Sequence, residues 1–572
     1  MTHATAGLAA LVLCVSCVAA APGLQGQQRG TGTRPVAGAP QVQFEDITQQ
    51  AGLAFRHTNG TSRDKHIVET MGSGGLFLDY DNDGWLDIFL VDGGSLADPR
   101  IAASARHRLY RNRRDGTFED VTTTARIAHQ GFGMGACAGD YDNDGWTDLY
   151  LTNGGSNTLY RNSGEGMFLD VTQTARVGAT RLSTSCAFAD LDRDGDLDLF
   201  VVQYVDLSAG EAYCGDSRVR AYCRPDVYRG LPNVLYRNNG DRTFTDVTRQ
   251  AGLYSTAGKG LGVVVSDYDD DGWPDLFVAN DLVPNFLYHN EGGGVFREVG
   301  LLAGVAVASD GKARAGMGTD FGDYDGDGRL DLVVTNFELE THNLYRNLGD
   351  GLFADATAGS GMNVATLSFL GFGTVFLDHD NDGDLDIAIA NGHVLDNADH
   401  FSARSSHAQR NLLLRNDGGR LRDVGLLAGK GFALIKVSRA LAAGDIDNDG
   451  DLDILVTNNG DTADLLRNAG GQGNALLVRV VGKQSNRNGV GVRMRLVAGN
   501  KAQIREVKTG SSYLSQSDLR QHVGLGRARQ ADRLEIRWPS GRTEVLQNIA
   551  ANAIITVVEG EGITARVPFA RR

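Results

Sequence analysis

The chain has 572 residues, too many for one compact core of the usual kind, so several domains or a repeat architecture are expected. Its formal net charge of -16 argues against nucleic acid and anionic membrane surfaces as partners. Seventy-five glycines, ten prolines and 7% aromatic residues favour short strands and tight turns, and they predict an all-β fold.

The N-terminal segment is typical of an export signal. Residues 1–20 contain no Lys, Arg, Asp or Glu, and the apolar run from Leu8 to Ala21 ends in small residues. This pattern predicts a signal peptide over 1–20, with a lipid anchor at Cys17 as the alternative. Residues 21–41 are rich in Gly, Gln and Thr and predict a flexible linker. No later segment approaches ~18 consecutive apolar residues, so no transmembrane segment is expected. The predicted location is extracellular, periplasmic or at the cell surface.

A nine-residue motif, here called the metal loop, occurs seven times, with Asp at positions 1, 3, 5 and 9 and Gly at position 6. The first copy runs from Asp79 to Asp87. A turn that offers so many oxygens is typical of a calcium site. Position 12 is apolar in every copy, as at Leu90, which excludes the EF-hand because that loop needs a bidentate Glu there.

We therefore predict about seven Ca²⁺ ions, which staple the turns rather than take part in catalysis. Position 7 holds residues as different as Trp85, Asp196 and Arg329, as expected where only the main-chain carbonyl binds the ion. The predicted ligands are, loop by loop, Asp79, Asp81, Asp83 and Asp87; Asp140, Asp142, Asp144 and Asp148; Asp190, Asp192, Asp194 and Asp198; Asp267, Asp269, Asp271 and Asp275; Asp323, Asp325, Asp327 and Asp331; Asp378, Asp380, Asp382 and Asp386; and Asp445, Asp447, Asp449 and Asp453.

Each metal loop lies between two predicted strands, a Gly-rich apolar segment before it and a β-branched or aromatic run after it. A third segment, with the pattern Leu-Tyr-Arg-Asn in most repeats, and a fourth that usually begins with Phe follow. Four short strands at this period describe a propeller blade, so we predict a seven-bladed β-propeller over 42–470. Strand 42–48 has no third strand ahead of it and is predicted to join the last blade, which closes the ring.

The long connections at 92–107, 203–233 and 391–410 are predicted to lie on the face opposite the metal loops and to hold the ligand. Residues 474–560 contain no metal loop, and their alternating pattern predicts a small β-rich, sandwich-like domain. Residues 561–572 are predicted to be a tail.

Four cysteines follow the predicted signal peptide. Cys214 and Cys223 lie nine positions apart in one insertion, and in an exported chain they predict a disulfide. Cys137 and Cys186 precede consecutive metal loops at offsets that differ by one residue, so their side chains should point to opposite faces of neighbouring strands. Two buried free thiols are therefore expected.

The metal loops resemble the FG-GAP/VCBS repeats of integrin α-subunit propellers across 42–470. Four C-terminal stretches look like the ASPIC/UnbV domain: Ser485–Gly491 (SNRNGVG), Gly510–Ser517 (GSSYLSQS), His522–Gly526 (HVGLG) and Trp538–Gly541 (WPSG). Together the two regions resemble the cartilage acidic protein 1 family and its bacterial relatives. The resemblance implies a secreted calcium-binding propeller with a C-terminal β domain, used in adhesion or extracellular recognition, with ligand bound opposite calcium.

The chain also departs from the animal members of that family. They carry a cysteine-rich EGF-like module at the C-terminus, whereas no cysteine follows Cys223 here. A cartilage role is therefore not transferred, and a bacterial exported protein is expected.

Two functions remain as hypotheses. The leading one is a recognition or adhesion module for an extracellular protein or glycan. The alternative is an enzyme of hydrolase or isomerase type with a site at the hub or in the 391–410 insertion, because a His with nearby carboxylates can serve acid–base chemistry. Its candidate residues are His393, Asp396, Asp399 and His400, with Asp206, Glu211 and Asp216 from the 203–233 insertion.

The absence of known catalytic motifs favours one of the two hypotheses. The chain has no Gly-x-Ser-x-Gly elbow, no His-Glu-x-x-His and no phosphate loop, so the non-enzymatic hypothesis is favoured. Ser485-Asn486-Arg487 and His522 are polar residues beside glycines and are expected to shape turns.

Overall fold

The computed structural model describes residues 42–96, 98–128, 131–208, 213–216, 218–471 and 473–570. The predicted signal peptide, the whole predicted linker, the possible anchor at Cys17 and the candidate Glu211 lie outside the described residues. The described residues form one compact unit, and their elements are mainly strands with a few short helices. The all-β class predicted from composition is therefore confirmed.

Seven four-stranded antiparallel sheets occupy the described residues between 44 and 468, and in each the metal loop joins the first strand to the second. The first three sheets are β2 (Gly75–Leu78), β3 (Asp87–Leu90), β4 (Arg108–Asn112) and β5 (Phe118–Asp120); β6 (Gly133–Gly139), β7 (Asp148–Asn153), β8 (Thr158–Asn162) and β9 (Phe168–Asp170); and β10 (Ser183–Ala189), β11 (Asp198–Gln203), β14 (Val234–Asn238) and β15 (Phe244–Asp246). The next three are β16 (Gly260–Ser266), β17 (Asp275–Asn280), β18 (Phe286–Asn290) and β19 (Phe296–Glu298); β20 (Thr319–Gly322), β21 (Asp331–Val334), β22 (Asn343–Gly349) and β23 (Leu352–Asp355); and β24 (Gly371–Leu377), β25 (Asp386–Asn391), β27 (Leu412–Asn416) and β28 (Leu421–Asp423). The last is β30 (Ser438–Gly444), β31 (Asp453–Asn458) and β32 (Asp464–Asn468), whose fourth strand is β1 (Phe44–Asp46).

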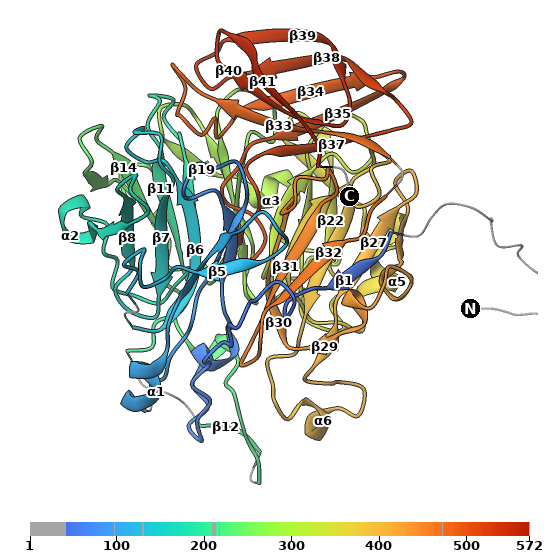
Figure 1. Cartoon of the computed structure of the whole chain (residues 1–572). Coiled ribbons are helices and arrows are strands. Elements are labelled where there is room, and N and C mark those ends of the chain that lie inside the picture. Colours follow the sequence, from blue (N-terminus) through green and yellow to red (C-terminus); the bar gives the residue numbers. More distant parts are fainter. Residues whose placement is uncertain are drawn as a thin grey trace, which may run out of the picture. The chain divides into compact units, whose positions relative to one another are not determined.

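The sheets form a propeller-like arrangement (Figure 1). Their first strands contact one another in sequence, from β2 through β6, β10, β16, β20 and β24 to β30, and β30 also contacts β2. The core lies between consecutive sheets; Phe77 and Ile88 of the first sheet, for example, belong to one cluster with Leu455 of the last. A Cβ on Gly135 of β6 would lie 2.9 Å from the carbonyl oxygen of Thr184, so the close approach of neighbouring first strands requires glycine there.

Cys137 of β6 and Cys186 of β10 form a disulfide, with their Cα atoms 5.8 Å apart and both residues buried. The expectation of two free thiols is therefore wrong. Consecutive sheets stack face to face, so the upper face of one sheet and the lower face of the next enclose the same space. Side chains on these opposite faces therefore point toward each other. The predicted disulfide between Cys214 and Cys223 is confirmed.

Residues 474–568 form two further sheets around one shared core that contains Val478, Leu496 and Trp538. Their strand orders are β37 (Gln521–Gly526), β33 (Asn474–Val481), β40 (Ala553–Val558) and β41 (Gly562–Pro568); and β35 (Lys501–Glu506), β34 (Arg493–Ala498), β38 (Gln530–Arg537) and β39 (Thr543–Ala550). The predicted tail is wrong over 562–568, because β41 pairs with β40. This edge strand is largely exposed, so it lacks the alternation of apolar residues that reveals a half-buried strand.

The connection between β35 and β37, residues 508–520, enters the centre of the seven sheets and is called the hub segment below. Its short strand β36 (Ser515–Gln516) pairs in parallel with β2. It also hydrogen-bonds to the first strands of five other sheets, β6, β10, β20, β24 and β30. Ser512 and Thr319, for example, exchange two main-chain hydrogen bonds, of 2.6 and 3.1 Å.

The remaining described elements are short. They are α1 (Pro99–Ser104), α2 (Thr172–Ala175), α3 (Gly300–Ala303), α4 (Thr357–Ser360), α5 (Met362–Thr366), α6 (Ala398–Phe401), η1 (Ile67–Thr70), η2 (Pro225–Val227), η3 (Gly425–Leu427), η4 (Gly431–Ala433), β12 (Cys214–Gly215), β13 (Arg220–Ala221), β26 (Gln409–Arg410) and β29 (Ile435–Lys436). None of the described helices has the length and apolar character needed to cross a membrane. In Figure 1 the two C-terminal sheets (orange to red) lie beyond one end of the seven sheets, and α1, β12 and α6 lie beyond the other.

Candidate metal centres

The first metal loop is held in shape by its own carboxylates. The two oxygens of Asp79 accept hydrogen bonds from the backbone N–H groups of Asp83 and Gly84, both at 3.0 Å. Asp87, at the start of β3, accepts from the backbone N–H of Asn112 at 2.8 Å. Positions 1 and 9 therefore converge on one turn, and their remaining lone pairs are left for a ligand.

Two positions of the loop adopt the left-handed backbone conformation. Asn82 at position 4 has φ 57°, and Gly84 at position 6 has φ 84°. Left-handed residues at both positions fold the chain tightly enough to bring positions 1, 3 and 5 together. The described groups of carboxylates whose oxygens lie within 4.8 Å of one another include Asp79, Asp81 and Asp87.

The residues at position 3 fit a bound cation. In five of the seven loops, the Oδ1 atom at this position is buried and has no hydrogen-bond partner in the described part of the chain. These residues are Asp81, Asp142, Asp192, Asp269 and Asp380. A buried carboxylate oxygen without a donor is costly, and an oxygen-binding divalent cation is the partner that this donor set suits.

The electrostatics of the loops agree with this fit. Burial, together with nearby carboxylates such as Asp81, raises the pKa of Asp87 to about 8. Burial likewise raises the pKa of Asp140 to about 7 and that of Asp190 to about 7. A cation in the loop would hold these groups in the charged form and reverse the shifts.

Arginines supply part of the compensating charge. Arg111 Nε lies 2.8 Å from Asp81 Oδ2, and Arg114 Nη2 lies 2.7 Å from Asp83 Oδ2. The first loop carries four carboxylates, so these two arginines leave two negative charges, which one divalent ion would balance.

An asparagine that sequence reasoning missed connects each loop to its neighbour. It is the last residue of the Leu-Tyr-Arg-Asn pattern on the third strand, and its side-chain Nδ2 donates to the position 2 carbonyl of the preceding repeat's loop. The donors and acceptors are Asn112 and Ile446, Asn162 and Tyr80, Asn238 and Tyr141, Asn290 and Leu191, Asn347 and Tyr268, Asn416 and Tyr324, and Asn468 and His379. The signal was present in the sequence, because this asparagine occurs in all seven copies.

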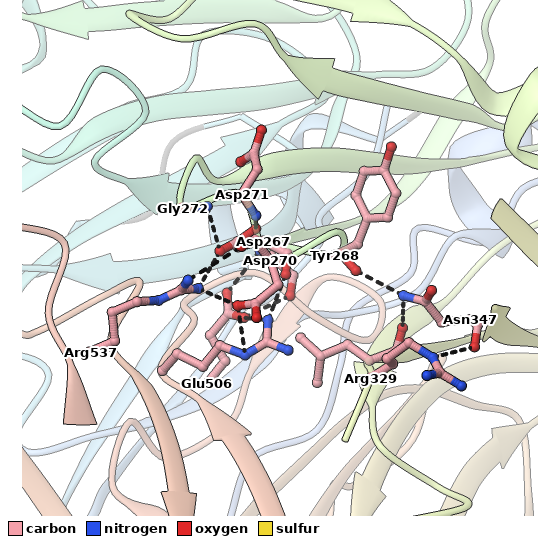
Figure 2. A network of polar contacts seen from close by, with 12 residues as sticks. Asp267, Tyr268, Asp270, Asp271, Gly272, Arg329, Asn347, Glu506 and Arg537 are labelled. Carbon is pink, nitrogen blue, oxygen red and sulfur yellow. Dashed lines mark hydrogen bonds and ion pairs between the residues drawn. The ribbon is translucent and has the colours of Figure 1, made fainter. Parts of the chain in front are cut away.

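The fourth metal loop has different basic partners from the first. His289 replaces the arginine of the third strand, and its Nδ1 lies 3.4 Å from Asp269 Oδ2 and 3.4 Å from Asp275 Oδ1. Arg537 of β38 forms an ion pair with Asp267 at position 1 of the same loop, as Figure 2 shows.

The predicted catalytic residues of the 391–410 insertion do not gather in one place. His393 is buried, its Nδ1 accepts from the backbone N–H of Leu395 at 3.0 Å, and burial lowers its pKa to about 4. Asp396 forms an ion pair with Lys65, and Asp399 is exposed on α6.

The candidates from the other insertion have separate partners. Asp216 Oδ2 lies 3.0 Å from His400 Nε2 at the surface, and Asp206 accepts from the backbone N–H of Ser208 at 2.9 Å. Asp396 and the Asp216–His400 pair thus connect the insertions, whereas the contacts given above for His393 and Asp206 are local.

The hub, the other site considered for an enzyme, contains the hub segment. Tyr513 is fully buried, its ring centroid lies 5.0 Å from that of Phe372, and its hydroxyl donates to the carbonyl oxygen of Met71 at 3.0 Å. His522 is also buried, and its Nε2 lies 3.0 Å from the Gly450 carbonyl oxygen in the seventh metal loop.

Two protein-family models match the chain, one over the repeats and one over the C-terminal region. The FG-GAP-like repeat model matches residues 79–151, 140–201, 223–278, 267–334 and 323–389, which together cover just over half of the chain. The ASPIC and UnbV model matches residues 482–564.

Individual relatives were also found. Cartilage acidic protein 1 of Homo sapiens is 29% identical over 341 residues, covering 57% of this chain and 48% of that protein. The Mus musculus protein is 29% identical over 346 residues, covering 57% and 49%. The chain thus matches about half the length of these relatives. A solved structure of an Agrocybe aegerita lectin that recognises non-reducing terminal N-acetylglucosamine has a TM-score of 0.36 and 18% identity, covering 68% of this chain and 86% of that chain.

Proposed function

Because the chain belongs to the FG-GAP-like repeat family and carries an ASPIC and UnbV domain, we propose that it is an exported calcium-stabilised propeller that recognises an extracellular protein or glycan. The calcium part of the proposal rests on the buried carboxylate oxygen at position 3, which has no hydrogen-bond partner within the described residues in five of the loops. The predicted Asp residues at positions 1, 3, 5 and 9 would hold the ions. Calcium would neutralise these carboxylates and fix the turns, which is a structural role.

The proposed architecture is a seven-bladed propeller closed by residues 42–48. Its support is the pairing of β1 with β32, in which Phe44 lies opposite Asn468. The hydrogen bond of 2.8 Å from Asn112 of the first sheet to Ile446 in the seventh loop adds to this support. A closed ring leaves fewer unpaired strand edges than an open array.

We place the ligand on the face that carries the insertions. Residues 61–69, 203–233 and 391–410 come from different repeats, and they contact one another through the ion pair between Lys65 and Asp396 and the hydrogen bond of 3.2 Å from Asn397 to the Arg220 carbonyl. A cavity of about 170 Å³ lies among them. A recess built from several long loops on a rigid scaffold is a common form of recognition site.

The cavity is mainly apolar with a few polar groups. Tyr204, Tyr222 and Phe337 line it together with Asp281. The Asp281 carboxylate accepts a hydrogen bond of 2.6 Å from the hydroxyl of Tyr204. Apolar walls with a small number of fixed polar groups suit a ligand that inserts a mixed apolar and polar group.

A binding screen tests the recognition role. Purified glycans and purified exported proteins are presented to the calcium-loaded full chain and to a Leu395→Trp variant, which fills the cavity. We expect the affinity of a true ligand to fall at least tenfold in this variant. Its affinity should stay unchanged in Leu302→Trp, a replacement at a 75% exposed site away from the cavity. Hits that are equal in both variants would contradict the proposed face.

A further inference from the structure

The metal-loop side also contains a recess, larger than the one among the insertions. A cavity of about 490 Å³ lies between the first metal loop and the sheet that contains β33 and β40. Trp85 and Asp79 line it from the propeller side, and Arg479 and Thr556 line it from the C-terminal sheet. A cavity of this size between two parts of a chain is in the usual range for small-molecule sites.

Three arginines line this cavity, and they differ in how they are held. Arg520 is fully engaged: Nε lies 2.7 Å from Asp518 Oδ2, Nη1 donates to Asn448 Oδ1 at 2.8 Å, and Nη2 donates to the Asp445 carbonyl at 2.8 Å. The guanidinium groups of Arg479 and Arg487 make no hydrogen bond or ion pair within the described residues.

The charge of Arg479 acts on Asp79 of the first metal loop, but neutralising that loop requires neither Arg479 nor Arg487. With one divalent ion, as proposed above, the four carboxylates of that loop are already balanced by the ion, Arg111 and Arg114. Arg479 and Arg487 are then surplus positive charge that faces a recess. Guanidinium groups in such a place favour a carboxylate or other oxyanion.

The other walls of the cavity suit a sugar ring. The half-buried indole of Trp85 offers a flat apolar surface. The hydroxyls of Thr147 and Thr556 line the same space and make no hydrogen bond within the described part of the chain. An inorganic anion would leave most of the volume unfilled, whereas a sugar can use the indole, the hydroxyls and the arginines together.

We propose that the cavity between the first metal loop and the C-terminal sheet binds an acidic sugar, with its carboxylate on Arg479 and Arg487 and its ring against Trp85. This second site goes beyond the face proposed for recognition, and it rests on the proposed calcium loading of the first loop. It also assigns a role to Arg487, which the sequence alone assigned only to a turn.

The test uses the full chain saturated with calcium. Calorimetry with D-glucuronate, D-glucose and inorganic sulfate separates the sugar from its charge. We expect glucuronate to bind at least tenfold more tightly than either comparator. Equal affinity for glucose would overturn the role of the arginines, and equal affinity for sulfate would overturn the assignment to a sugar.

Variants then locate the site. Arg479→Gln and Arg487→Gln should each weaken glucuronate binding about tenfold, the usual loss for one charge-assisted hydrogen bond. Arg487 is exposed, so its replacement is not expected to disturb folding. Arg529→Gln, at an exposed position outside the cavity, is the matched control and should bind as wild type does. Unchanged binding in both cavity variants overturns the proposal.

Calcium content is measured on the same samples. A calcium-loaded protein that does not bind glucuronate overturns this inference alone, and a protein without calcium overturns the proposed function.

Discussion

At the scale of single residues, Asp81 illustrates what a metal-loop carboxylate contributes. Its buried Oδ1 has no donor among the described residues, and it lies close to two other carboxylates, those of Asp79 and Asp87. With calcium, Asp81→Asn should remove one ion and destabilise the chain by about 1.4 kcal/mol, the linkage expected at ~10-fold saturation. With chelator, the same change should be neutral or stabilising, because it removes one of several like charges.

Denaturant unfolding in calcium and in EDTA measures this difference, together with the calcium content. Asp115→Asn, in an exposed turn outside the metal loops, should behave as wild type does in both conditions. An equal loss of stability in calcium and in EDTA would show that Asp81 acts without an ion.

The pH dependence of stability is argued from buried histidines outside the metal loops. His342 is fully buried, its Nδ1 accepts from the backbone N–H of Asn336 at 3.0 Å, and burial lowers its pKa to about 3. Below pH ~6.5 the unfolded chain binds a proton that the folded chain excludes. The free energy of unfolding therefore falls as the pH drops, by up to about 1.4 kcal/mol per pH unit for this residue.

His57 is buried in the same way, with its pKa lowered by burial to about 3. Between pH 6 and 4, the free energy of unfolding should change less steeply with pH in His342→Asn than in the wild type. It should change less steeply still in the double variant that combines His342→Asn with His57→Asn. Urea unfolding at several pH values measures the slope. Identical slopes in all three proteins would rule out these histidines as the cause.

At the scale of elements, the asparagines of the third strands join consecutive sheets. Asn347 donates to the carbonyl of Tyr268 at 2.8 Å and to that of Leu330 at 3.0 Å, and it is buried (Figure 2). Asn347→Ala leaves both acceptors without this donor, so a loss of about 2–4 kcal/mol is expected in denaturant unfolding. Asn239→Ala removes an exposed asparagine bonded only to Thr243 and Thr245, and it should cost much less.

The hub segment makes a second prediction at this scale. Tyr513→Ala removes a fully buried ring that packs on Phe372, so about 3–5 kcal/mol should be lost. Tyr513→Phe removes only the hydrogen bond to the Met71 carbonyl and should cost about 1 kcal/mol. Tyr254→Ala, at a 45% exposed side chain, is the control. If Tyr513→Ala unfolds at the wild-type denaturant concentration, the segment does not support the hub.

Strands beside the metal loops could be predicted, whereas contacts between sheets could not. The β-branched and aromatic residues that follow the first metal loop predict a strand, and β3 (Asp87–Leu90) lies at that position. The pairing of Cys137 with Cys186 depends on how two sheets stack, which no local pattern records. The exposed edge strand β41 (Gly562–Pro568) was missed because it has no buried face.

At the scale of the whole molecule, the C-terminal region is bound to the seven sheets from within. The hub segment ties β35 and β37 to the first strands of six sheets. The sequence of Gly510–Ser517 has no apolar period, and its hydrogen bonds go to residues more than 70 positions away, as from Thr374 to Ser512 and from Ser515 to Leu441. Its insertion therefore could not be read from the sequence.

The central claim is that calcium holds the seven sheets in their native form. The most direct measurement is the calcium content of the purified chain by elemental analysis, with thermal unfolding before and after chelation. The account predicts close to seven ions per chain and a large fall in melting temperature in EDTA that added calcium restores. Two or fewer ions per chain, with an unchanged melting temperature in EDTA, would contradict it.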